Sequence, residues 1–101
     1  MPRFNSNAPV MLNVTIAVPG TAEQLASHFI PDGLSVVIKA DIENDGNIYW
    51  GYTQAGAQGT ARETLVSGQD SAPLYIDDLS RIWMDAENAT DTAEINIMKA
   101  G

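Results

Sequence analysis

Few side chains in this sequence are of a kind that could catalyse a reaction. His28 is the only histidine, so a catalytic triad would have to use it, and no nucleophile motif stands beside it. Asp77 and Asp78 are adjacent carboxylates, but glycoside hydrolysis needs two carboxylates at a defined separation across a cleft, and this pair reads as part of a turn. The chain has no cysteine, which excludes disulfides, zinc–thiolate sites and thiol catalysis. We expect no catalytic residues, no cofactor and no enzyme activity.

An acidic run is the one candidate for a metal site. Residues 41–48 read Asp-Ile-Glu-Asn-Asp-Gly-Asn-Ile and match the first eight positions of a calcium loop of the EF-hand type, in which hard oxygen ligands surround a sharp turn. Asp41, Glu43 and Asp45 would be the ligands. The position that should carry a bidentate Glu is Tyr52, and the flanking residues follow a β pattern. We therefore expect a hairpin tip with solvated carboxylates, and these three residues are only a weak metal candidate.

The charge balance restricts the class of partner. The chain has 101 residues, the length of one domain, and its 13 acidic against 5 basic residues give a net charge of −8. Phosphate backbones and anionic membranes both attract clustered Lys and Arg, whereas the basic residues here are scattered. No apolar stretch has the length of a secretory signal or a membrane span. We expect no nucleic acid and no membrane as partner, and a protein made and assembled in the cytosol.

Apolar and polar residues alternate along most of the chain, a pattern that predicts β-strands. Residues 12–18, 34–42 and 48–52 each place apolar side chains at every second position, as half-buried strands do. Asp45-Gly46 between the last two runs is a strong hairpin signal. Residues 53–62 read as a loop. Further strands are expected at residues 63–66, 73–77, 81–86 and 93–98, with an edge strand or a single helical turn at 22–26.

Seven or eight short strands at this spacing predict an all-β protein, an antiparallel β-sandwich of jelly-roll type. We assign residues 12–101 to this single domain and residues 1–11 to an N-terminal arm. The arm contains Phe4 and several other apolar residues, and Arg3 is its only charged residue. A disordered tail is usually more charged and less apolar, so two alternatives stay open: the arm orders against a neighbouring subunit, or it frays. Arg3 and Phe4 are therefore candidate partner-binding residues.

Three aromatic side chains are expected on outer strand faces. If Ile48, Trp50 and Tyr52 face the core, Tyr49 faces away from it. Tyr75 and Trp83 likewise alternate with inward-facing aliphatic residues. The outer face of a sandwich strand is normally polar, and exposed Tyr and Trp are typical anchors of protein contacts, so these three are candidate partner-binding residues. The alternative is a β-bulge that shifts the faces by one residue.

Several short motifs follow one another along the chain. They are GTAEQL at 20–25, IPDG at 30–33, VIKA at 37–40, NIYWG at 47–51, LVSGQD at 65–70 and IDDLSRIWMDA at 76–86. In this order, over about residues 20–98, the chain resembles small β-sandwich virion proteins of tailed bacteriophages, often head decoration (cement) proteins. The acidic tip at 43–45 departs from the commonest form of these proteins.

The resemblance implies a structural role without catalytic residues. A decoration protein of this kind sits on the capsid surface as a homotrimer, binds the lattice of the major capsid protein and stabilises the head, after assembly in the host cytoplasm. Two alternatives remain open. One is an adaptor of the tail, collar or fibre, and the other is a carbohydrate-binding module that uses Tyr49, Trp50 or Trp83 as a platform for stacking sugars.

Overall fold

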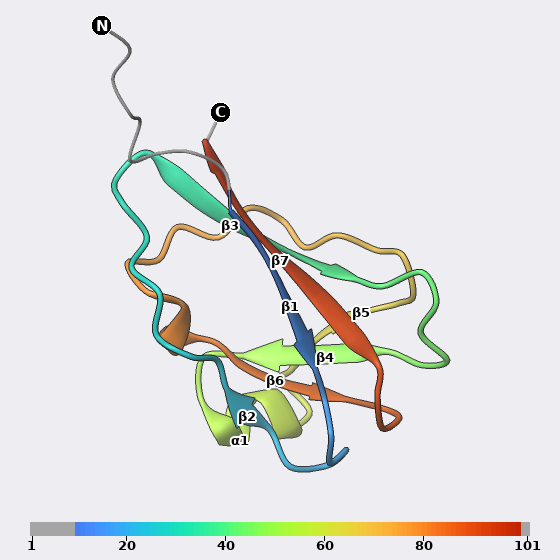
Figure 1. Ribbon diagram of the computed structural model, residues 1–101. Coiled ribbons are helices and arrows are strands. Elements are labelled where there is room, and N and C mark those ends of the chain that lie inside the picture. Colours follow the sequence, from blue (N-terminus) through green and yellow to red (C-terminus); the bar gives the residue numbers. More distant parts are fainter. Residues whose placement is uncertain (1–9, 100–101) are drawn as a thin grey trace, which may run out of the picture.

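The protein folds into two facing antiparallel sheets, as the alternation predicts. The structure is a computed structural model that describes residues 10–99 (Figure 1). Its strands are β1 (Val10–Thr15), β2 (Glu23–Gln24), β3 (Leu34–Ala40), β4 (Ile48–Gly51), β5 (Glu63–Leu65), β6 (Trp83–Ala86) and β7 (Thr92–Lys99). A short helix, α1 (Gln54–Gln58), follows β4, and a 3₁₀ turn, η1 (Leu79–Arg81), precedes β6. No helix among the described residues is long and apolar enough to cross a membrane.

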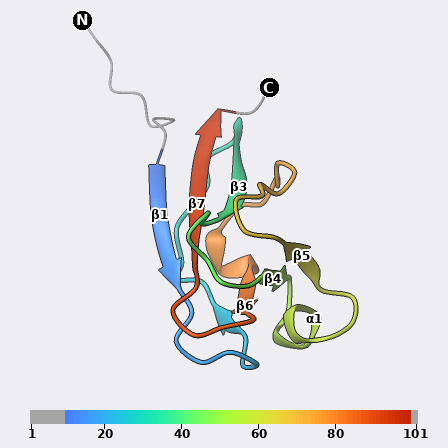
Figure 2. The same ribbon diagram turned by 90° about the vertical axis from the view of Figure 1, so that its right-hand side faces the viewer.

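The strand order is that of a jelly roll with one irregular strand. One sheet has the order β1-β7-β3 and the other β2-β6-β4-β5, and every pair is antiparallel (Figure 2). Residues 69–74 extend the first sheet beyond β3: Val36 and Leu74 exchange backbone hydrogen bonds of 2.9 and 2.8 Å. With this segment counted as a strand, the chain passes between the two sheets as it does in jelly rolls. The sandwich prediction is therefore confirmed.

The core lies between the sheets and is made by alternate residues of each strand. Because successive side chains of a strand point to opposite faces, β7 buries every second residue. The fully buried large side chains are Ile16, Val36, Ile38, Ile48, Ile82, Met84, Ile95 and Ile97. Trp50 joins them from β4 with 6% of its surface exposed. One apolar layer thus holds both sheets together.

Most strands begin or end a few residues away from the sequence-based expectation, and three differences matter most. The first strand begins at Val10, which pairs with Ile97, so the predicted arm boundary at residue 11 is wrong by two residues. Arg3 and Phe4 lie outside the described residues. Residues 53–62 contain α1, where the Thr53 hydroxyl accepts a 2.8 Å hydrogen bond from the Gly56 N–H, a helix cap. The segment 73–77 makes only a single bridge, at Leu74, rather than a strand.

The two faces of β7 should respond very differently to truncation. We expect Ile95→Ala to lower the free energy of unfolding by about 2–5 kcal/mol, because it leaves a cavity at a side chain of 0% exposure. Asn96→Ala, its neighbour on the outer face, should change it by no more than about 0.5 kcal/mol. Chemical denaturation of both variants makes the comparison. Equal losses would show that the core does not lie on the Ile95 face.

Candidate functional site

The outer face of the four-stranded sheet is covered, which removes Tyr49 from the solvent. Tyr49 alternates with the core residues Ile48 and Trp50 and faces away from them, as expected, but only 8% of its surface is exposed. The Arg62 guanidinium lies over its ring at 3.4 Å from the centroid, a cation–π contact. The expectation of a solvent-exposed Tyr49 is therefore wrong, because the segment that follows β4 folds back over this face.

The close fit of α1 explains how this cover forms. A Cβ on Gly51 would lie 2.8 Å from the Ala57 backbone N–H nitrogen, so only glycine fits where the helix crosses β4. Asp85, which is opposite Tyr49 on the same outer face, is also covered: it is 2% exposed and accepts hydrogen bonds from the Gly20 and Ala86 N–H groups at 2.9 and 2.8 Å. This side of the sheet is a second, smaller packing layer.

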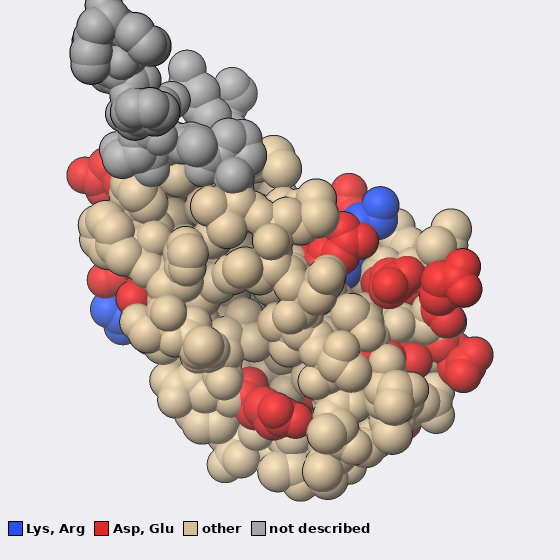
Figure 3. Space-filling model, viewed as in Figure 1, with Lys and Arg blue, Asp and Glu red and all other residues tan. Residues whose placement is uncertain are grey.

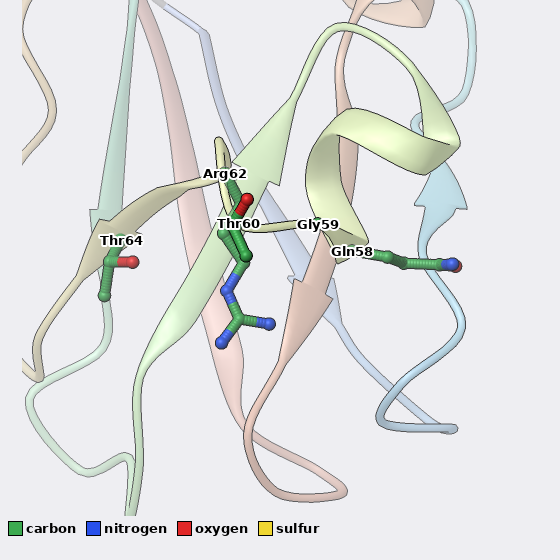
Figure 4. Close-up of a pocket in the computed structure, with 5 residues that line it drawn as sticks. All are labelled: Gln58, Gly59, Thr60, Arg62 and Thr64. Carbon is green, nitrogen blue, oxygen red and sulfur yellow. The ribbon is translucent and has the colours of Figure 1, made fainter.

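A shallow hollow of about 380 Å³ lies at the end of α1 (Figure 4). Its lining carries one charged group, Arg62, whose guanidinium is already stacked on Tyr49. Gln58 points toward β2, where its side-chain oxygen accepts a hydrogen bond from the Ala22 N–H at 2.6 Å. Of the rings considered as a sugar platform, Tyr49 and Trp50 are both buried, which weighs against that use.

The hairpin predicted at Asp45-Gly46 is wrong, because β3 and β4 lie in different sheets and do not pair with each other. The acidic segment that connects them is held by Asp41 within it and by Asp91 of the turn before β7. Asp41 accepts a hydrogen bond from the Glu43 N–H at 3.0 Å. The N–H groups of Asp45 and Gly46 donate to the buried Asp91 carboxylate at 3.2 and 3.1 Å. No group of three or more metal-ligating side chains occurs among residues 10–99. The weak metal candidate at Asp41, Glu43 and Asp45 therefore gains no support from the geometry.

Acidic side chains gather on the side of the molecule where these turns lie (Figure 3). The turns between β3 and β4 and between β6 and β7 are joined through Asp91, and Glu87 accepts a 3.0 Å hydrogen bond from the Asn47 N–H. Negative charge is thus concentrated at these turns. Water solvates the exposed carboxylates, and together they repel a partner whose surface is also acidic.

The most exposed aromatic side chains lie elsewhere, on the segments that lead into β3 and η1. Tyr75 is 71% exposed, as expected, and Phe29 is 70% exposed. A hollow of about 280 Å³ separates residues 30–34 from residues 75–77, and Tyr75 forms part of its wall. Phe29 comes directly before Ile30, the first residue that lines the hollow, and its backbone forms an isolated β-bridge with Asp78. We call Phe29, Tyr75 and this hollow the Phe29–Tyr75 surface.

Asp78 fixes the two segments of this surface to each other. Its carboxylate accepts hydrogen bonds from the Ser80 N–H at 2.9 Å, the Ser27 hydroxyl at 2.9 Å and the His28 N–H at 3.1 Å. The backbone adds a bond of 2.8 Å from the Ile30 N–H to the Asp77 carbonyl. Phe29 is therefore presented on a backbone held on both sides, which lowers the entropy lost when a partner covers it.

The same contacts stabilise the charged form of Asp78. The Ser80 N–H, helped by the hydroxyls of Ser27 and Ser80 and by the His28 N–H, lowers its pKa from 3.8 to about 2. The pKa of the neighbouring Asp77 is lowered by the hydrogen bond and the charge of Arg81, whose Nε lies 2.9 Å from the Asp77 carboxylate.

Sequence reasoning missed Phe29 and gave the wrong exposure for two tyrosines, Tyr49 and Tyr52. Tyr52, expected to face the core, is 54% exposed because β4 ends at Gly51, and it meets Trp50 edge-on at 5.4 Å between ring centroids. Trp83 is half-buried. Phe29 stands in a segment without periodicity, so no pattern marks its exposure. No protein-family model, curated protein or solved structure matches the chain.

The pKa of Asp78 predicts a pH dependence of stability. The pKa of Asp78 in the folded protein lies below its usual value. Its charge therefore contributes fully to the stability of the fold above about pH 4, and this contribution is lost as the pH falls toward 2. Asp78→Asn should melt at a lower temperature than the wild type at pH 7, and the difference should vanish near pH 2. Asp32→Asn, an exposed turn residue, is the control. A difference that stays constant with pH would contradict the role of the charge.

Proposed function

We propose that this protein is a structural subunit that acts by binding another protein surface, and that its partner is the capsid lattice of a tailed bacteriophage. The single observation that carries the proposal is the Phe29–Tyr75 surface. Phe29 and Tyr75 each have about 70% of their area in water; Tyr75 lines the hollow, and Phe29 stands next in the chain to its lining residue Ile30, on a backbone that is held in place on both sides. Aromatic anchors in such settings supply a large share of the energy of protein contacts.

The distribution of charge supports a protein partner with a specific docking face. The carboxylates at the loop ends keep free subunits apart and soluble, whereas Phe29 and Tyr75 are uncharged and ready to be desolvated. Asp77, which lines the hollow, is paired with the basic group of Arg81. A partner would therefore meet an aromatic patch edged by one ion pair, a composition typical of an interface with an apolar centre and a polar rim.

The sequence resemblance supplies the virion as the place of action. Jelly rolls recur in viral capsid and lectin domains, although a fold by itself does not define a function. On this proposal the protein is a head decoration protein that binds the major capsid protein and reinforces the capsid surface, after assembly in the host cytoplasm. The homotrimer implied by the resemblance belongs to the same proposal. Repetition over the lattice converts modest contacts into strong attachment.

Truncation of the two aromatic side chains tests the proposal. We expect Tyr75→Ala and Phe29→Ala each to weaken binding to mature heads of the phage that encodes the protein. The loss should be roughly thirtyfold, because a central aromatic anchor contributes about 2 kcal/mol. Cosedimentation of heads with increasing protein measures the affinity.

Tyr52→Ala is the matched control, since it removes an exposed tyrosine on another part of the molecule. It should bind heads as the wild type does. Wild-type protein that does not bind heads would contradict the proposed partner. Equal binding by all three variants would show that the Phe29–Tyr75 surface is not the docking face.

A further inference from the structure

The hollow of the Phe29–Tyr75 surface has an apolar floor and an acidic rim. Among the residues that line it, Ile30 and Leu34 are only 3% and 5% exposed, so they form the floor. Asp32 and Asp77 line it as well, and both are exposed, so they lie at the rim. A group that fills the hollow must therefore cover apolar area and meet negative charge at the same time.

The negative charge at this rim is only partly neutralised. The one ion pair among residues 10–99 joins Arg81 to Asp77, so Asp32 pairs with no basic group in this part of the chain. Asp78, next to Asp77, is a third carboxylate, and its pKa of about 2 keeps it ionised at neutral pH. Three carboxylates against one guanidinium leave a local excess of negative charge. The net charge of −8 has the same sign, so both the rim and the whole molecule attract a cation.

One kind of protein side chain matches both parts of the hollow. An aliphatic or aromatic side chain would cover the floor but would remove the Asp32 carboxylate from water without giving it a partner, which is costly. An acidic side chain would be repelled. Lysine and arginine have a long apolar stem that packs on apolar surface and a charged head that stays at a polar rim. The Tyr75 ring in the wall of the hollow adds a surface on which a cation can lie.

We propose that this hollow receives a lysine or arginine side chain of the partner protein, with its stem on Ile30 and Leu34 and its charged head at Asp32. The inference rests on the proposed function, because it takes the major capsid protein as the partner, and it specifies what that partner presents at the contact. Phe29 and Tyr75, buried in the same contact, exclude water from around the ion pair. An ion pair is stronger where water is excluded.

The other two hollows are poorer seats for a basic side chain. The hollow at the end of α1 contains Arg62 as its charged group, which repels a second cation. A hollow of about 270 Å³ beside β5 contains two carboxylates, Glu63 and Asp70, but its one aromatic residue, Trp50, is 6% exposed. It therefore lacks exposed aromatic anchors, and Asp70 serves as a matched control for Asp32.

Removal of the Asp32 charge tests the inference. We expect Asp32→Asn to bind mature heads roughly tenfold more weakly, because the basic side chain of the partner loses its counter-charge. Asp32→Lys should bind more weakly still, since it sets two like charges together. Asp70→Asn removes a carboxylate that is also exposed and should bind as the wild type does. Cosedimentation with heads measures the affinities, and equal melting temperatures at pH 7 check that each variant is folded.

The salt dependence of binding is a second measurement. The affinity of the wild type for heads should fall as the sodium chloride concentration rises, because salt screens the ion pair, and the affinity of Asp32→Asn should fall less steeply. Equal affinities or equal salt dependence for these two proteins, with Tyr75→Ala still weakened, would overturn the inference and leave the docking face standing. Wild-type protein that does not bind heads would overturn the proposed function and this inference together.

Discussion

The apolar layer between the two sheets is the interaction on which the rest of the molecule depends. Ile95 and Ile97 of β7 lie in it, and Ile48, Trp50 and Met84 meet them from the other sheet. Because strand side chains alternate, burying this layer commits every other residue to an outer face. The outer faces and edges must then be covered, charged or bound by a partner. The structure shows the first two solutions, and the proposed docking face is where the third would apply.

On the four-stranded sheet the outer face is covered by the chain itself. The Arg62–Tyr49 contact and the close approach of Ala57 to Gly51 close this face, so it has no large surface left for a partner. At the loop ends, the buried Asp91 carboxylate ties two neighbouring turns, and the exposed carboxylates around it are solvated. Among residues 10–99, the large uncharged side chains that remain exposed include Phe29 and Tyr75, the Tyr52 ring and scattered aliphatic side chains such as Ile42 and Val66. The proposed docking face uses the first two.

The fold class could be predicted from the sequence because a two-residue period has one physical cause, the burial of one strand face. The exposed aromatic residues could be predicted only in part. Tyr75 is exposed as alternation implies, but Tyr49 is hidden by a segment rich in glycine, alanine and glutamine, whose tertiary packing leaves no periodic trace. Phe29 has no periodic neighbours at all. Its exposure depends on the hydrogen bonds of Asp78, which join segments about 50 residues apart.

The location of the protein on an intact particle tests the central claim most directly. Electron cryomicroscopy of mature heads that carry the protein should show it on the outer surface of the capsid, with the hollow between residues 30–34 and 75–77 turned toward the major capsid protein and both flanking rings buried at the contact. Density that leaves Phe29 and Tyr75 facing solvent would contradict the assigned docking face. Density only at the tail, or none on the particle, would contradict the function itself.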